Sequence, residues 1–156
     1  MSLAGRPLET LEGQSLPGVR QLSVFLDNKV GQLLRLTQMI DTKDIKILGL
    51  SVVDAIDYAV VRLLCDSPDE AVSILREAGY SFSVSEVILV SLPPGKRGLL
   101  AVWQCLLSAE INVGCCYPLL PPKLGPVLAI SVDNLEIATD TLVRNKFEIL
   151  GEADLK

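Results

Sequence analysis

The chain has 156 residues, of which 49% are hydrophobic, 4% are aromatic and 21% are charged, and its net charge is −5. This composition predicts a packed core of aliphatic side chains and argues against a disordered chain. Scattered lysines and arginines argue against a nucleic-acid partner, and the apolar runs are shorter than the roughly 20 residues of a membrane span. No basic segment followed by an apolar one opens the chain, so we expect a cytoplasmic protein.

Apolar periodicity divides the first half of the chain into six elements that follow an N-terminal arm over residues 1–17. A strand, a helix, two strands, a helix and a strand are expected in turn, over 19–26, 32–43, 47–53, 58–65, 68–78 and 81–85. The second helix has the strongest start signal. Ser67 can cap it, Pro68 suits its first position, and Glu70 completes a capping box. Gly79 is expected to end it.

The second half repeats this order, with elements expected over 87–92, 99–109, 111–117, 126–132, 135–145 and 147–150. Its first helix is expected to bury one face made of Leu99, Val102, Trp103, Leu106 and Leu107. The repeated β-α-β-β-α-β order is the ferredoxin-like motif. We therefore predict an α+β fold of two such domains, 18–85 and 86–156, with antiparallel sheets joined edge to edge and helices on one face.

Matching residues recur at a nearly constant interval, which indicates a duplicated module. Gly31 and Gly98 each open a helical run and are 67 residues apart, as are Asp66 and Asp133. The segments 44–47 and 110–113 match at an offset of 66, so one single-residue slip separates the copies.

Catalysis and metal binding find little support in the residue types. The chain has no histidine, which removes the commonest general base and metal ligand. Cys65, Cys105, Cys115 and Cys116 form no Cys-x-x-Cys pair, so small buried thiols in a reducing compartment are expected. We expect no catalytic residue, no metal site and no cofactor.

The stretch 22–34 contains a hydrophobic strand, the turn Asp27-Asn28-Lys29-Val30-Gly31 and an apolar helix start, and it resembles the opening of the ACT domain. The second strand of each copy opens in the family's manner, at 45–47 and 111–113. The resemblance covers about residues 19–152 as tandem copies, similar to small bacterial proteins made of two such domains. It implies a regulatory module of amino-acid metabolism. Val30 departs from the proline frequent in the family, and Pro94 stands where Asp27 stands in the first copy.

The strand-to-helix turn is where a small anion is expected, because glycine permits close approach and the first helical amides are unsatisfied. The carboxylate of an amino acid would bind these amides, while its ammonium would meet Asp27 or Asn28. The expected ligand-binding residues are Asp27, Asn28, Val30, Gly31, Gln32, Leu33, Gly98, Leu99 and Asn112. An ordinary turn also explains residues 27–31, and a polar strand end explains Asn112 equally well.

These observations favour a non-catalytic regulatory module that binds a small amino acid or related metabolite at the seam between the two strand-to-helix turns. A homodimer is expected, with output through self-association or an unknown protein partner. The alternative is a structural dimerisation or protein-interaction module without a ligand. An enzyme is a third class, and the absence of a paired acid–base constellation argues against it.

Overall fold

The computed structural model describes residues 8–9, 15–16, 18–42 and 44–156. The expected arm over 1–17 lies mostly outside these residues. Where it is described, it forms the short antiparallel strands β1 (Leu8–Glu9) and β2 (Ser15–Leu16). The chain divides into two compact units, one of Arg20–Ser85 and one that combines Glu86–Lys156 with Met1–Val19.

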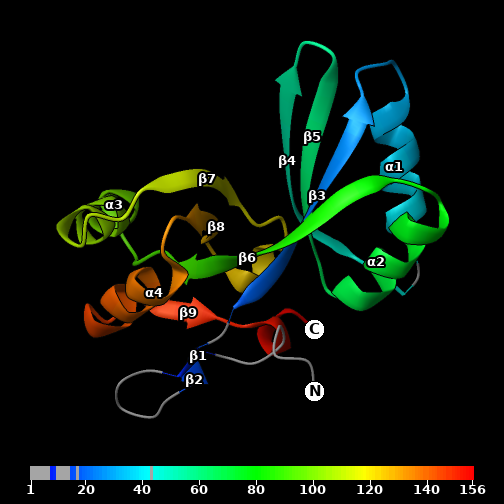
Figure 1. Ribbon diagram of the computed structural model, residues 1–156. Coiled ribbons are helices and arrows are strands. Elements are labelled where there is room, and N and C mark those ends of the chain that lie inside the picture. The colour runs from blue at the N-terminus through cyan, green and yellow to red at the C-terminus, as the bar shows by residue number, and fades with distance from the viewer. Residues whose placement is uncertain (1–7, 10–14, 17, 43) are drawn as a thin grey trace. The chain divides into compact units, whose positions relative to one another are not determined.

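The Arg20–Ser85 unit has the expected strand and helix order (Figure 1). Its elements are β3 (Val19–Asp27), α1 (Gln32–Ile40), β4 (Ile47–Ala55), β5 (Tyr58–Cys65), α2 (Pro68–Glu77) and the beginning of β6 (Ser81–Ser91). The strands form an antiparallel sheet in the order β4-β5-β3-β6, and α1 and α2 lie on one face.

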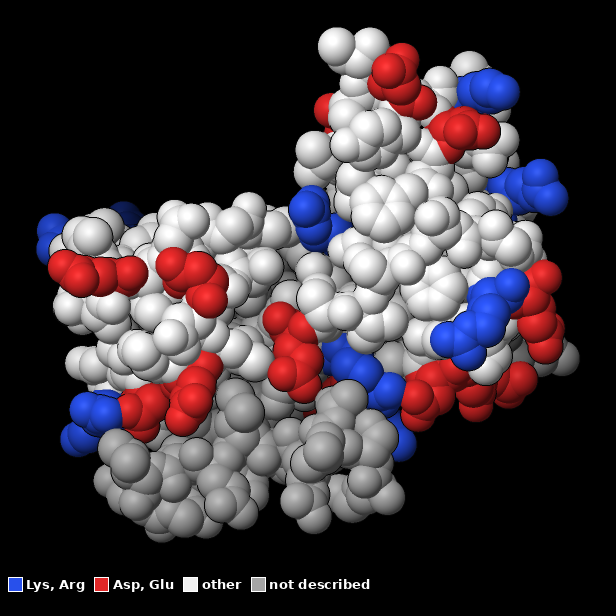
Figure 2. Space-filling model, in the orientation of Figure 1, with Lys and Arg blue, Asp and Glu red and all other residues white. Residues whose placement is uncertain are grey.

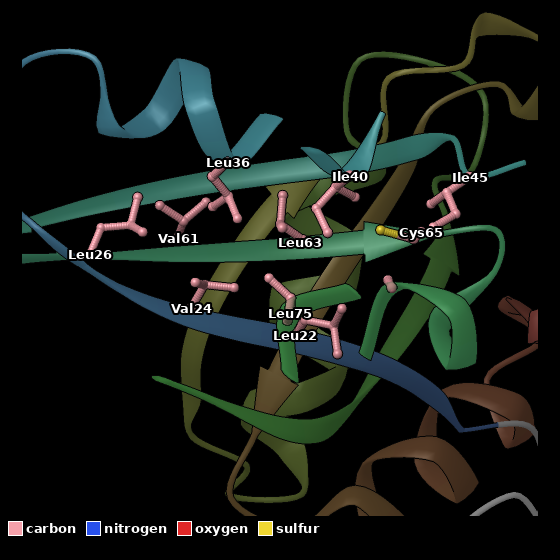
Figure 3. Packing of buried hydrophobic residues seen from close by; sticks show 11 residues of the cluster. Leu22, Val24, Leu26, Leu36, Ile40, Ile45, Val61, Leu63, Cys65 and Leu75 are labelled. Atoms are coloured by element: carbon pink, nitrogen blue, oxygen red, sulfur yellow. The ribbon is translucent and has the colours of Figure 1, made fainter. Parts of the chain in front are cut away.

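Aliphatic side chains between this sheet and its helices form the core of the unit, as Figure 3 shows. Leu22, Val24 and Leu26 alternate along β3 and point toward the helices, as period-two patterning requires. Leu36 and Ile40 lie four residues apart on α1, and both are fully buried.

The second unit repeats the plan. Its elements are the rest of β6, α3 (Gly98–Ser108), β7 (Val113–Pro118), the 3-10 helix η2 (Pro122–Leu124), β8 (Val127–Val132), α4 (Leu135–Arg144), β9 (Glu148–Leu150) and the 3-10 helix η3 (Glu152–Leu155). β6 pairs with β8 and β9, and β7 pairs with β8, all antiparallel. A separate aliphatic core lies beneath α3 and α4. The predicted α+β fold with two β-α-β-β-α-β copies is confirmed.

A pair of hydrogen bonds recurs in both copies. The Lys46 amide donates to Asp66 Oδ1 at 2.8 Å, and the Asp66 amide donates to the Lys46 carbonyl at 3.1 Å. The Asn112 amide donates to Asp133 Oδ1 at 3.1 Å, and the Asp133 amide donates to the Asn112 carbonyl at 3.2 Å. The offset between copies is thus 66 residues before this point in each hairpin and 67 after it. The single-residue slip therefore falls within the β7–β8 hairpin.

Three local expectations are wrong. The strands expected over 81–85 and 87–92 form one continuous strand, β6, because Glu86 continues the extended backbone. Ser67 occupies the N-cap position of α2 without capping it, since its hydroxyl donates to the Asp44 carbonyl at 3.2 Å. The turn expected at 54–57 contains only Ile56 and Asp57, because β4 continues to Ala55.

The buried face of α3 also differs from the expected one. Val102, Cys105 and Leu106 are buried, whereas Leu99 and Leu107 are exposed. The helix is apolar on nearly every side, so periodicity alone did not identify the face that packs on the sheet. The cysteines are correspondingly mixed: Cys65 and Cys105 are buried, but Cys116 is exposed and Cys115 is half-buried.

Candidate functional site

The turn between β3 and α1 is an exposed corner of the Arg20–Ser85 unit. Asp27, Asn28 and Lys29 are all exposed there. The Lys29 amide donates to the Asp27 carbonyl at 2.8 Å, and Asn28 Nδ2 donates to Asp54 Oδ1 at 2.8 Å. Because Asp54 lies near the end of β4, this bond fixes the turn to the β4–β5 hairpin.

The first turn of α1 presents backbone amides without a side-chain cap. Gly31 is the N-cap residue and adopts a left-handed conformation with φ 88°, and no side chain caps the helix. The Arg35 amide donates to the Gly31 carbonyl at 3.0 Å, but no described hydrogen bond uses the amides of Leu33 or Leu34. Helix α4 differs, because Asn134 Oδ1 accepts from the Ile137 amide at 3.0 Å.

This geometry suits a small anion. The unsatisfied amides at a helix start point outward and add to the partial positive charge of the helix dipole. The first turn of α1 contains no acidic residue that would oppose an anion. A Cβ on Gly31 would meet nothing within 4 Å, so the space beside the turn is open.

Apolar side chains lie next to these amides. Val30 is fully exposed, Leu33 is partly exposed, and Gln32 is half-buried at the first helical position. An acceptor-binding helix start, a carboxylate at Asp27 and exposed aliphatic groups are thus contributed by one stretch of eight residues or fewer.

The corresponding corner of the other unit is built differently. Gly98 is the first residue of α3 and Arg97 is its N-cap residue, so the structural counterpart of Gly31 is Arg97. The equivalence of Gly31 with Gly98 is therefore wrong by one residue. Gly98 is buried, and a Cβ there would lie 2.6 Å from the Pro93 carbonyl oxygen. Gly31 thus supplies an unusual backbone angle, whereas Gly98 permits a close backbone approach.

Asn112 lies at the other end of α3 from Gly98 and Leu99. It follows the end of the helix, and its backbone forms both hydrogen bonds to Asp133 described above. An 11-residue helix is about 16 Å long, so these candidate residues occupy separate ends of their element.

Sequence reasoning missed Asp54, which binds the Asn28 side chain. The two residues are 26 positions apart, and strand register brings them together: Leu26 pairs with Ala59 on β5, which pairs with Asp54 on β4. An aspartate next to a predicted hairpin turn was the available signal, but it also fits an ordinary turn residue.

The ionisable groups elsewhere in the described chain show no reactive arrangement. Burial raises the pKa of Cys65 to about 12, and the nearby Asp66 and Asp41 carboxylates raise it further. Burial, followed by the neighbouring Cys115, also raises the pKa of the Cys116 thiol. Raised thiol pKa values oppose formation of the nucleophilic thiolate.

Charge and hydropathy features are equally plain. Lys and Arg residues are interspersed with Asp and Glu on the face shown in Figure 2. Within residues 18–42 and 44–156, no group of three His, Cys, Asp or Glu side chains is placed to hold a metal ion. None of the described helices is long and apolar enough to cross a membrane.

Two ferredoxin-like units with open strand-to-helix turns define a class of small paired α+β modules. A family model described as the ACT domain pair matches residues 18–156. The chain therefore belongs to the ACT domain pair family, and the resemblance seen in the sequence is confirmed. ACT domains are regulatory modules, so the assignment is consistent with ligand-binding regulation.

Solved structures share this fold. Protein BT0572 from Bacteroides thetaiotaomicron is similar with a TM-score of 0.79 and 24% identity, over 88% of this chain and 95% of that chain. The regulatory subunit of aspartate kinase from Thermus thermophilus gives a TM-score of 0.59 and 12% identity, over 83% and 93% of the two chains. The search of curated proteins found no match.

Proposed function

We propose that this chain is a non-catalytic regulatory module that binds a small amino acid or related metabolite at the β3–α1 turn. The uncapped, exposed start of α1 carries the proposal. Family membership supports it, as does similarity to a protein described as the regulatory subunit of aspartate kinase. Regulation would be exerted through a homodimer or through another protein.

In this proposal the backbone binds the carboxylate of the ligand. The amides of Leu33 and Leu34 donate to its oxygens, and the α1 dipole favours the negative charge. Gly31 leaves room for the carboxylate to approach, because nothing lies within 4 Å of its Cβ direction.

Side chains of the same turn would recognise the rest of the ligand. The Asp27 carboxylate meets the ammonium, and Asn28 adds its side-chain oxygen, since its Nδ2 is held by Asp54. Val30 and Leu33 offer exposed aliphatic surface to a small apolar side chain. An ammonium, a carboxylate and an aliphatic group at fixed spacing are the features of an α-amino acid.

A thermal-shift screen of the twenty amino acids tests the proposal, followed by calorimetry of each compound that stabilises the protein. A ligand at 100 times its Kd should stabilise the folded state by about 2.7 kcal/mol. Asp27→Asn should weaken binding about tenfold, because it removes a charge-assisted hydrogen bond. The matched control is Asp57→Asn, which removes the same charge from an exposed turn residue elsewhere in the unit and should leave the Kd unchanged.

A flat screen would overturn this function and favour the structural alternative, an assembly module without a ligand. Binding that Asp27→Asn and Asp57→Asn weaken equally would refute the site at the β3–α1 turn, because both variants change only the net charge in common.

A further inference from the structure

Helix α3 has an apolar outer face that the fold of its own unit does not use. Leu99, Leu100 and Leu107 are 46%, 49% and 75% exposed, and Trp103 is half-buried beside them. The helix contains no charged residue from Gly98 to Ser108. A helix that is apolar all round normally has apolar neighbours on more than one side.

The other copy of the repeat shows that this face is not required by the fold. Buried Leu36 and Ile40 of α1 correspond to buried Val102 and Leu106 of α3, at an offset of 66 residues. At the same offset, Thr37 corresponds to Trp103, and Asp41 corresponds to Leu107. The same element therefore has polar residues in one copy where α3 has its largest exposed apolar side chains.

Charges at the two ends of α3 indicate what covers the face. Lys96 precedes the helix and Glu110 follows it, and both are exposed. No ion pair within the described part of the chain involves either residue. When two copies of α3 lie antiparallel with Trp103 at the centre, Lys96 of each copy falls opposite Glu110 of the other.

The apolar residues obey the same symmetry. With Trp103 facing its own equivalent across a twofold axis, Leu99 of one copy faces Leu107 of the other, since each lies four residues from the centre. An interface in which one patch contacts itself is the geometry of a twofold homodimer.

We propose that the outer face of α3, made of Leu99, Leu100, Trp103 and Leu107, is an interaction surface for a second copy of this chain, with the two helices antiparallel. One helix face is smaller than the roughly 1,200–2,000 Å² that stable interfaces bury, so the dimer is weak and concentration-dependent. The proposal does not rest on ligand binding, because the β3–α1 turn belongs to a different element.

Sedimentation velocity over a micromolar concentration series tests this surface. The wild-type chain should dimerise as concentration rises, and Leu107→Asp, which introduces the residue of the equivalent α1 position, should weaken the dimer about tenfold or more. Leu99→Asp is a second variant with the same expectation. Ile56→Asp is the control, because Ile56 is 95% exposed in the β4–β5 turn, and it should leave the dimer intact. Far-UV circular dichroism confirms that each variant is folded.

Charge reversal tests the antiparallel orientation. Lys96→Glu and Glu110→Lys should each weaken the dimer, because each places like charges opposite one another. An equimolar mixture of the two variants should restore it, since both contacts then join opposite charges. Trp103 is the only tryptophan, so its emission should shift to shorter wavelength as the dimer forms.

A chain that stays monomeric throughout the series would overturn the proposal. A dimer that Leu107→Asp and Leu99→Asp leave unchanged would overturn the surface. A dimer that these variants weaken, but that the mixture of charge variants does not restore, would overturn the antiparallel arrangement.

Discussion

Cys65 is a buried thiol whose ionisation opposes folding. It lies in the core of the Arg20–Ser85 unit, where Figure 3 shows its sulfur near Ile45 and Ile40. Burial, followed by the neighbouring Asp66 and Asp41 carboxylates, raises its pKa from 9.0 to about 12. Between these two values the unfolded chain loses the proton while the folded chain retains it.

The free energy of unfolding should therefore fall as the pH rises above about 9. The folded state then binds more protons than the unfolded state, and each such proton contributes a slope of about 1.4 kcal/mol per pH unit. Urea unfolding at pH 8, 9 and 10 measures the slope. Cys65→Ala should lower stability at pH 8 by removing core volume, but its slope should be shallower than that of the wild type. Cys115→Ala, at a partly buried thiol, is the control, and parallel lines for the wild type and Cys65→Ala would contradict the assignment.

Three helices end in the same way with different residues. After α2, α3 and α4 the chain turns through a left-handed residue, and these residues are Gly79 (φ 78°), Glu110 (φ 56°) and Lys146 (φ 65°). In each case the next amide donates to a carbonyl five residues earlier, for example Tyr80 to Leu75 and Phe147 to Leu142, both at 3.0 Å. Glycine accommodates this conformation readily, whereas glutamate and lysine are strained in it.

Lys146→Gly should consequently stabilise the protein by about 0.5–1 kcal/mol, because relief of the left-handed strain exceeds the extra entropy of an unfolded glycine. The chain supplies its own control at the equivalent end of α2, where Gly79→Ala should destabilise by about 1 kcal/mol. Urea unfolding gives both values. Loss of stability in both variants would show that Lys146 makes a contact that outweighs its strain.

Elements were predictable from the sequence wherever one periodicity dominated. Alternation along β3 and the apolar stripe of α1 identified both elements, since each presents a single buried face. The outer face of α3 was not predictable, because leucines occur on both its buried and its exposed sides. At the candidate site, the turn and its glycine were visible in the sequence, but the bond from Asn28 to Asp54 depends on strand register across three strands.

At the scale of the whole chain, the duplication was visible before its exact alignment was. Repeated aspartates and helix starts indicated two copies, but the conspicuous glycines, Gly31 and Gly98, occupy different helical positions. The boundary between copies was misplaced for a related reason. Residues on both sides of Glu86 favour an extended backbone, and β6 continues through it from one compact unit into the other.

Because an uninterrupted strand rather than a linker joins the units, we expect them to unfold in one cooperative transition. Each has its own aliphatic core, so a core substitution in one unit tests whether the other responds. Leu36→Ala removes a fully buried side chain of the Arg20–Ser85 unit and should cost about 3–5 kcal/mol. Trp103, the only tryptophan, packs against the core of the other unit.

Unfolding of Leu36→Ala in urea should be followed by Trp103 fluorescence and by far-UV circular dichroism at one low protein concentration. In a cooperative transition the two curves coincide, and the fluorescence midpoint falls as far as the dichroism midpoint. Ile56→Asp, at an exposed turn of the same unit, should move neither midpoint appreciably. If the Trp103 transition keeps its wild-type midpoint while part of the dichroism signal is lost at lower urea, the two units unfold independently despite sharing β6.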